Sequence, residues 1–151
     1  ILDYVASGRQ FIGICLGMQL LFDHSEESGG CEGLQIIPGK VVSIPRWNLV
    51  GKAIRRPHIG WVNLQKEVEC SSSLPIRMSY SESDQFYFTH SYYVVPRDKT
   101  VIMAYADYDG IDLTAVIHKE QVFGFQFHPE KSGVAGLQIY RNFVRFVAEK
   151  G

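Results

Sequence analysis

The sequence predicts an α/β fold, on the basis of three observations. A short buried strand over residues 10–14 runs through two glycines directly into a helical pattern over residues 16–23. Short strands, separated by proline and glycine, fill the middle of the chain. An amphipathic helix over residues 134–149 closes the sequence. No long linker or repeat divides the chain, so we expect a single domain over residues 1–151.

The remaining elements follow from periodicity and turn residues. Residues 1–7 read as the end of a helix with no cap before it, so we expect that an N-terminal part of a longer protein precedes them. Residues 24–33 are polar and glycine-rich and predict a loop, and residues 70–84 form a serine-rich connection. Asp109-Gly110 predicts a turn between two strands. The predicted strands of this region span residues 40–44, 60–64, 86–89, 92–95, 101–105, 113–118 and 122–127.

Helical spacing divides the last helix into two faces. An apolar face opposes a polar one, so the apolar face is expected to pack on the body of the protein. The apolar face consists of Leu137, Tyr140, Val144 and Val147.

Composition excludes several classes of function. A net charge of −1 over 151 residues leaves no electrostatic footprint for nucleic acid or an anionic membrane surface. No apolar run approaches the roughly 20 residues of a membrane span. Cys15, Cys31 and Cys70 are widely spaced and indicate neither a disulfide framework nor a metal site. We therefore expect a cytoplasmic protein without metal or cofactor, in which Cys31, Cys70, His24 and His118 have no functional role.

The stretch from Gly13 to Gly17 predicts a nucleophile. Cys15 lies between two glycines at a strand-to-helix junction, the spacing of a nucleophile elbow. Gly13 should let the turn close, and Gly17 should let the helix pack against its strand. The helix N-terminus should favour the Cys15 thiolate, and the N–H of Leu16 could form half of an oxyanion hole. A lone cysteine is more often a small buried core residue, so this motif needs a second one.

The second motif is His128-Pro129-Glu130. Side chains two residues apart on a strand point to the same face, so His128 and Glu130 should project together. The carboxylate could fix the imidazole tautomer and leave the other ring nitrogen for the nucleophile. Cys15, His128 and Glu130 would then be nucleophile, base and orienting group.

These two motifs, Gly13-Ile14-Cys15-Leu16-Gly17-Met18-Gln19 and Gln126-Phe127-His128-Pro129-Glu130-Lys131, resemble those of the class I, triad-type glutamine amidotransferases. Met18, residues 57–61 and residues 87–93 are similar to one branch, the glutaminase subunits of imidazole glycerol phosphate synthases. The resemblance implies a three-layer fold with a mixed, mainly parallel central sheet flanked by helices, plus a small antiparallel sheet. It also implies N-terminal strands that this sequence lacks.

The resemblance further implies a reaction and its partners. Glutamine would be hydrolysed through a Cys15 thioester, and ammonia would pass to a cyclase subunit in a heterodimer. Gln19, Glu27 and the segment His90-Ser91-Tyr92 match positions that hold glutamine. Trp61, Tyr87 and Lys131 match positions at the interface with the cyclase.

The sequence departs from the branch at two places. Val62 follows Trp61 where the family usually has asparagine, which affects a local turn or contact. The family's Pro-Gly-x-Gly oxyanion loop is absent, and Pro38-Gly39 lies after the nucleophile and cannot replace it.

Three alternatives remain open at this point. A γ-glutamyl hydrolase shares the elbow and a similar His-Pro-Glu, but would need no ammonia acceptor. Amidotransferases for anthranilate, aminodeoxychorismate, guanylate or carbamoyl phosphate are nearer rivals, which Met18 disfavours. The third alternative is a binding subunit without activity, which the intact Cys15, His128 and Glu130 disfavour.

Overall fold

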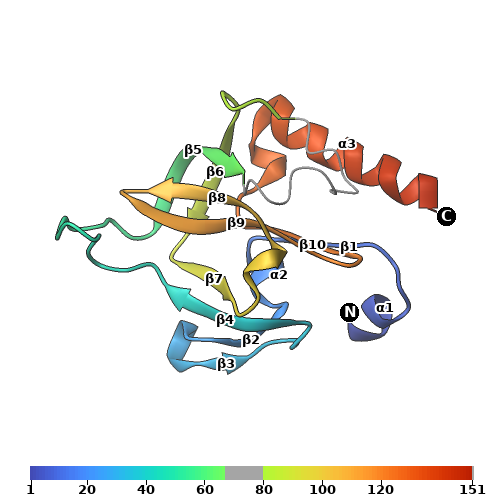
Figure 1. Cartoon of the computed structure of the whole chain (residues 1–151), viewed down its shortest axis with the longest axis horizontal. Coiled ribbons are helices and arrows are strands. Elements are labelled where there is room, and N and C mark those ends of the chain that lie inside the picture. The colour runs from blue at the N-terminus through green and yellow to red at the C-terminus, as the bar shows by residue number, and fades with distance from the viewer. Residues whose placement is uncertain (67–79, 151) are drawn as a thin grey trace.

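The structure is a computed structural model that describes residues 1–66 and 80–150, and the serine-rich connection and Cys70 lie largely or wholly outside these residues. Within these residues, two short α-helices and one long α-helix accompany ten strands; Figure 1 shows their arrangement. In chain order they are α1 (Leu2–Ala6), β1 (Phe11–Ile14), α2 (Leu16–Gln19), β2 (Phe22–Ser25), β3 (Cys31–Glu32), β4 (Ile37–Ser43), β5 (His58–Lys66), β6 (Gln85–His90), β7 (Tyr92–Pro96), β8 (Ile102–Tyr108), β9 (Ile111–Lys119), β10 (Val122–Phe125) and α3 (Gly133–Lys150).

Six strands form the larger sheet, in the order β1-β10-β9-β8-β5-β6. Only β1 and β10 pair in parallel, with Ile14 opposite Phe125, and the other neighbours are antiparallel. The sheet is therefore mixed, as expected, but mainly antiparallel rather than mainly parallel among the described strands. Short connections explain the difference, because a two-residue turn at Asp109-Gly110 can join only antiparallel strands.

The smaller sheet has the order β3-β2-β4-β7. We expected it to be antiparallel, but β2 and β4 run parallel to each other. It is built partly from residues that the sequence predicted to be helix or loop. Phe22–Ser25 is strand β2 rather than the end of the helix after the elbow, and residues 24–33 include β3 rather than forming only a loop. The local sequence pattern did not predict these two strands because hydrogen bonds to neighbouring strands stabilise them. This pairing overrides local propensity.

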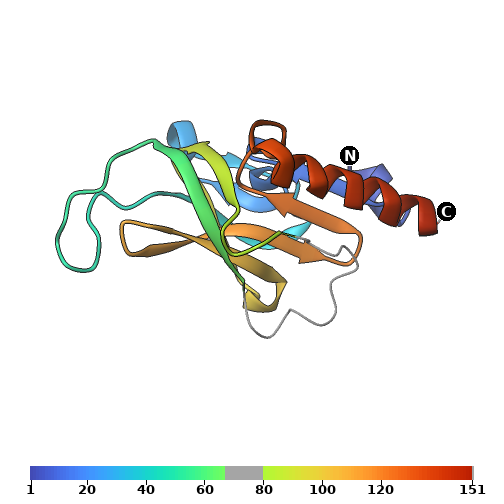
Figure 2. The same cartoon turned by 90° about the horizontal axis from the view of Figure 1, so that it is seen from above.

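The larger sheet lies between two covering layers (Figures 1 and 2). On one face, α3 packs its Ile139 and Phe146 against strand residues such as Phe123. On the other face, α2 and the smaller sheet enclose a second core. Its members include Met18, Leu21, Phe22, Val41, Val94, Ile102, Ile117 and Val122. This arrangement confirms an α/β fold with mixed sheets and fixes β1 and β10 side by side between the layers.

The buried face of α3 differs from the predicted one. Leu137, Val144 and Val147 are exposed, whereas Ile139 and Phe146 are buried. Ala135 and Phe143 complete the inward face at helical spacing. The helix is apolar on two faces, so periodicity alone could not identify the one that packs on the sheet.

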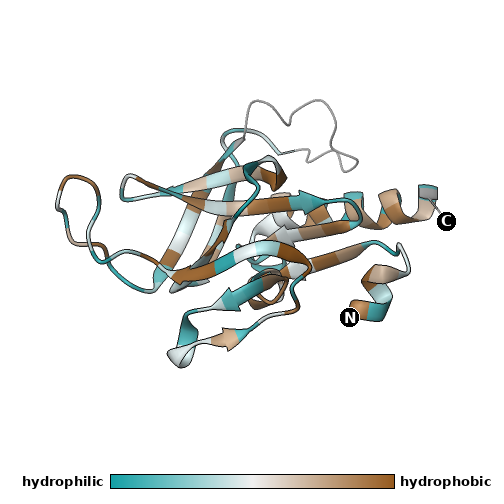
Figure 3. Cartoon of the chain, turned by 60° about the horizontal axis from the view of Figure 1, so that its bottom comes forward, coloured by the Kyte–Doolittle hydropathy of each residue, from teal (hydrophilic) through white to brown (hydrophobic). Residues whose placement is uncertain are grey.

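A long connection between β4 and β5 extends away from the body and carries a hydrophobic segment at its tip (Figures 2 and 3). Trp47, Leu49 and Val50 are all exposed on it. The Asn48 side chain donates a hydrogen bond to the Asp109 carbonyl at 2.8 Å, which ties this connection to the turn between β8 and β9. No helix in the described part of the chain is long and apolar enough to cross a membrane.

Candidate active site

Cys15 occupies a strained turn between β1 and α2. Its backbone φ of 49° and ψ of −106° fall in a region that side-chain-bearing residues rarely adopt. The N–H of Cys15 donates to the Phe125 carbonyl at 2.7 Å, so the turn is held by the parallel partner of β1. Strained backbone that neighbours hold in place is typical of functional sites, and this geometry matches a nucleophile elbow.

Gly13 permits the close approach that the elbow needs. A Cβ on Gly13 would lie 2.6 Å from the Gly17 carbonyl oxygen, so only glycine fits there. The expectation for Gly17 is wrong, because a Cβ added to it would meet no atom within 4 Å. Gly124 on β10 is a further close approach, since a Cβ there would lie 2.7 Å from Met18 Cγ. The elbow helix thus packs over glycines of both parallel strands.

His128 and Glu130 make the predicted contact. The distance from His128 Nδ1 to Glu130 Oε1 is 2.6 Å. β10 ends at Phe125, however, and His128 precedes a 3₁₀ turn over Pro129–Lys131, so the contact does not arise on a strand face as predicted. The extended backbone of His128, followed by the turn, brings the two side chains together instead.

Parallel pairing explains why the two motifs meet. Because Ile14 lies opposite Phe125, the chains that continue to Cys15 and to His128 leave the carboxyl ends of neighbouring parallel strands. Burial raises the pKa of the Cys15 thiol, and the Glu130 carboxylate adds to this rise. The base and the nucleophile therefore lie in one region of the molecule.

One pocket of about 230 Å³ brings Cys15 and Leu16 together with the residues that the sequence singled out for substrate binding, whereas His128 and Glu130 are not among its lining residues. Residues from the elbow, from the loop after β2 and from the β6–β7 junction line it. They are Cys15, Leu16, Gln19, Glu27, Thr89, His90, Ser91 and Tyr92. Thr89 is the one lining residue that the sequence analysis did not select. Their proximity supports the predicted roles in substrate binding, which stay predictions.

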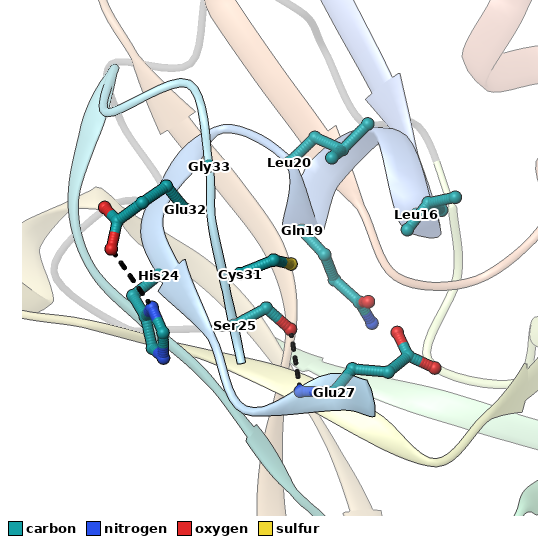
Figure 4. Close-up of a pocket in the computed structure, with 9 residues that line it drawn as sticks. All are labelled: Leu16, Gln19, Leu20, His24, Ser25, Glu27, Cys31, Glu32 and Gly33. Atoms are coloured by element: carbon teal, nitrogen blue, oxygen red, sulfur yellow. Dashed lines mark hydrogen bonds and ion pairs between the residues drawn. The ribbon is translucent and has the colours of Figure 1, made fainter. Parts of the chain in front are cut away.

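A smaller neighbouring hollow shares Leu16, Gln19 and Glu27 with this pocket (Figure 4). The amide of Gln19 and the carboxylate of Glu27 point toward each other there (Figure 4). Cys31 lies in the same wall and is exposed. Of the other residues expected to be structural, His24 pairs with Glu32 at 3.4 Å and His118 contacts the Glu120 carbonyl at 2.7 Å.

Burial raises the pKa of the Cys15 thiol above its ordinary value. The N–H of Leu16 and the amide of Gln126 act in the opposite direction but do not fully compensate. The N–H at the helix start therefore favours the thiolate as expected, but burial outweighs it and the net shift favours the thiol. The Glu130 and Glu27 carboxylates add to the rise because they oppose a further negative charge nearby.

Behind the pocket lies a pair of buried histidines. The Tyr92 carbonyl can only accept, so His90 Nδ1 donates to it at 2.8 Å and His90 Nε2 becomes an acceptor for His58 Nδ1 at 3.2 Å. Burial lowers the pKa of both histidines to about 4. Both imidazoles are therefore neutral near pH 7, and that of His90 holds the Ser91-Tyr92 segment in place.

Trp61, Tyr87 and Lys131 gather into one surface cluster, which we call the aromatic–lysine cluster. The rings of Trp61 and Tyr87 meet edge to face at 5.7 Å, and Lys131 Nζ lies 5.9 Å from the Tyr87 ring centroid. Half of the Trp61 side chain is exposed. Val62, which replaces the usual asparagine, instead packs against the core.

Sequence reasoning missed two polar residues. Gln126 is fully buried, and its Nε2 donates to Cys15 Sγ at 3.7 Å. Ser132 is also buried, and its hydroxyl donates to the His128 carbonyl at 2.6 Å while accepting from the Tyr87 N–H at 2.9 Å. Gln126 lies in the motif that contains His128, and a polar residue directly after an apolar strand was the available indication; Ser132 lies four residues after His128, just beyond that motif.

A cysteine elbow on β1 and a His-x-Glu pair after its parallel neighbour β10, in an α/β fold with mixed sheets, are the features by which the sequence resembles the class I glutamine amidotransferases. The family model for class I glutamine amidotransferases matches residues 1–146, and the chain belongs to this family. Among its relatives is the imidazole glycerol phosphate synthase subunit HisH of Syntrophotalea carbinolica, which is 46% identical over 144 residues, 95% of this chain and 68% of that protein.

Other relatives carry the same name. The HisH subunits of Geobacillus kaustophilus and Bacillus subtilis are 43% and 41% identical over 147 and 148 residues, respectively. These matches cover 97% and 98% of this chain and 67% of each relative, so the chain spans about two thirds of their length.

Solved structures agree on the fold. A putative GMP synthase protein from Thermoplasma acidophilum superposes with a TM-score of 0.65 at 17% identity, covering 98% of this chain and 62% of that one. A glutamine amidotransferase from Thermotoga maritima gives 0.58 at 17% identity, covering 99% and 52%. At this identity the likeness establishes the fold alone.

Proposed function

We propose that this chain is the glutaminase domain of an imidazole glycerol phosphate synthase that acts in histidine biosynthesis. It hydrolyses glutamine to glutamate and ammonia, and ammonia passes to a cyclase subunit with which it forms a cytoplasmic heterodimer. The observation that carries the proposal is the single pocket that unites Cys15 with Gln19, Glu27, His90, Ser91 and Tyr92. The HisH relatives, at 41–46% identity over most of the chain, support the choice of synthase.

The residues divide the chemistry between them. His128 accepts the proton of the Cys15 thiol as Sγ attacks the side-chain carbonyl carbon of glutamine, and the Leu16 N–H stabilises the oxygen that becomes negative. His128, oriented by Glu130 at 2.6 Å, gives a proton to the nitrogen, which leaves as ammonia. Water then attacks the thioester, releasing glutamate and restoring the thiol.

Substrate recognition follows from charge. Glu27 carries the negative charge that suits the α-ammonium group of glutamine, and Gln19 offers a neutral polar group beside it (Figure 4). Backbone groups of the His90-Ser91-Tyr92 segment, which lines the same pocket, suit the remaining polar atoms of the substrate. The pocket therefore offers one charged group and several neutral polar groups beside the nucleophile.

The aromatic–lysine cluster supplies the docking surface for the cyclase in this proposal. Exposed aromatic rings with a paired cation are typical anchors of protein interfaces. Docking there should raise the rate of glutamine hydrolysis about 5- to 150-fold, the usual range for coupled sites.

The test measures ammonia and glutamate released from glutamine with and without the cyclase. Release that rises with added cyclase, is abolished by Cys15→Ala and is retained by Cys31→Ala supports the proposal. Cys31 is a matched control because it is a second thiol near the pocket. Cyclase-independent cleavage of γ-glutamyl peptides would instead identify a γ-glutamyl hydrolase and overturn the proposal.

A further inference from the structure

Gln126 links the nucleophile to the substrate pocket from inside the protein. It follows β10 directly, its side chain has no exposed surface, and its backbone N–H donates to the Ala115 carbonyl at 2.9 Å. Its side-chain amide has two partners, Cys15 Sγ at 3.7 Å and Gln19 Nε2 at 3.2 Å. A buried amide between a nucleophile and a pocket residue is well placed to orient both.

The Tyr92 carbonyl determines which amide atoms donate and which accept in the series of hydrogen bonds from Tyr92 through Gln19 and Gln126 to Cys15. Gln19 places one amide atom 2.9 Å from the Tyr92 carbonyl oxygen, and because that oxygen can only accept, the atom must be Nε2. The same Nε2 approaches Gln126, which must therefore present Oε1 to it. The remaining atom of the Gln126 amide is Nε2, an obligatory donor to Cys15 Sγ.

This order of donors and acceptors determines what Gln19 can offer to a ligand. Both hydrogens of its amide are used, one by Tyr92 and one by Gln126, so only Oε1 remains to face the pocket. The Glu27 carboxylate points toward the same place (Figure 4). Two acceptors that line one pocket suit a cationic N–H donor and repel a second carboxylate.

We propose that Gln126 is a positioning residue that performs two linked tasks: it donates a hydrogen bond to the Cys15 sulfur, and it locks Gln19 as an acceptor toward the α-ammonium group of the substrate. The proposal rests on the glutaminase function stated above. It assigns to one buried amide an influence on both the reactivity of the nucleophile and the affinity for substrate.

The two tasks predict separable changes if the amide is altered selectively. Gln126→Met keeps the length and the uncharged character of the side chain but removes both hydrogen bonds. Gln126→Glu keeps an acceptor for Gln19 Nε2, but as a carboxylate it has no hydrogen for Cys15 and adds a negative charge beside the thiolate. Gln121→Met is the matched control, because Gln121 is a partly buried glutamine that donates to the Val5 carbonyl at 2.7 Å instead.

The experiment follows alkylation of Cys15 by iodoacetamide as a function of pH, read by peptide mapping, and the KM for glutamine in the complex with the cyclase. For Gln126→Met we expect the alkylation midpoint to rise by about 0.4 to 1 pH unit and KM to rise about 2- to 12-fold, the loss of one ordinary hydrogen bond in each case. For Gln126→Glu we expect a larger rise of the midpoint with KM close to that of the parent. Gln121→Met should change neither.

Thermal unfolding of each variant shows whether the protein is still folded. In a folded variant, a changed midpoint or KM reports on the lost hydrogen bonds of the Gln126 amide. An unchanged alkylation midpoint in a folded Gln126→Met protein would overturn the proposal, as would equal changes in KM for both Gln126 variants. Protection of Cys15 by glutamine in the parent protein tests the proposed function separately. If glutamine gave no protection there, the glutaminase function would fail, whereas the alkylation midpoints would still report on the bond from Gln126 to the thiol.

Discussion

The N–H of His128 donates a hydrogen bond to the Tyr87 carbonyl at 2.9 Å, which ties the proposed base directly to the aromatic–lysine cluster. Ser132 makes a second connection, because its hydroxyl bonds both the Tyr87 N–H and the His128 carbonyl. The backbone of β6 at Tyr87 therefore carries one ring of the cluster and also holds the His128 segment. A partner that pressed on the cluster would act on the position of the imidazole through these two connections, which comprise three hydrogen bonds.

Replacing the exposed anchors should weaken the cyclase complex. Trp61→Ala removes the ring that packs on Tyr87, and Lys131→Ala removes the cation beside the same ring. We expect each to cost about 1 kcal/mol or more of binding free energy, as for anchor residues in interfaces, with little loss of folding stability. Isothermal titration with the cyclase measures the first quantity, and thermal unfolding measures the second.

Trp47→Ala provides a matched control for this experiment. Trp47 is also an exposed tryptophan, but it lies on the long connection between β4 and β5 rather than on β5 itself. Binding that depended on Trp47 and was indifferent to both Trp61 and Lys131 would place the interface elsewhere on the molecule.

Ser132→Ala should reduce stability and coupling together. The substitution leaves the Tyr87 N–H without its partner and frees the His128 carbonyl. A buried group left unsatisfied costs about 1–3 kcal/mol, so the free energy of unfolding in urea should fall by that amount. Stimulation of glutamine hydrolysis by the cyclase should fall as well. Ser81→Ala, at an exposed serine outside this network, should change neither quantity.

Much of the architecture follows from local sequence patterns, and the misassigned parts depend on non-local pairing. The elbow, β5–β10 and α3 were recognisable because glycine spacing, alternation and helical periodicity are local properties. β2 and β3 were misassigned because pairing stabilises them as strands more than their own residues do. The direction of pairing in the larger sheet likewise depends on connections that periodicity does not specify.

The sequence predicted the reactive residues of the candidate site, but not the buried residues that hold them in place. Cys15, His128 and Glu130 carry recognisable chemistry in recognisable spacing. The roles of Gln126 and Ser132 depend on hydrogen bonds that span the fold, from β10 to the elbow and from β6 to the turn before α3. The direction of the shift in the thiol pKa was also inaccessible, because it depends mainly on how deeply the fold buries Cys15.

His128→Ala should be more damaging than Glu130→Gln. Removing a positioned base lowers turnover by about 10² to 10⁴. Glu130 orients the imidazole at 2.6 Å and also lies 3.4 Å from the Tyr140 hydroxyl, so its amide replacement keeps a polar contact and should cost less. Steady-state ammonia release in the complex with the cyclase gives both turnover numbers. A greater loss in Glu130→Gln than in His128→Ala would show that the assigned roles are reversed.

Stability should fall as the pH is lowered from about 6.5 toward 4, because burial lowers the pKa of both His58 and His90 to about 4. Above the ordinary histidine value both states are neutral. Below it the unfolded chain binds protons that the folded protein excludes, which favours unfolding by up to about 1.4 kcal/mol per pH unit for each histidine. His58→Phe keeps a ring between Phe88 and Tyr108 but removes one titrating group, so it should reduce the slope. Urea unfolding from pH 7.5 to 4 measures how the free energy of unfolding depends on pH in the parent protein and in His58→Phe. Equal slopes in the two proteins would contradict the assignment of this pH dependence to the buried pair.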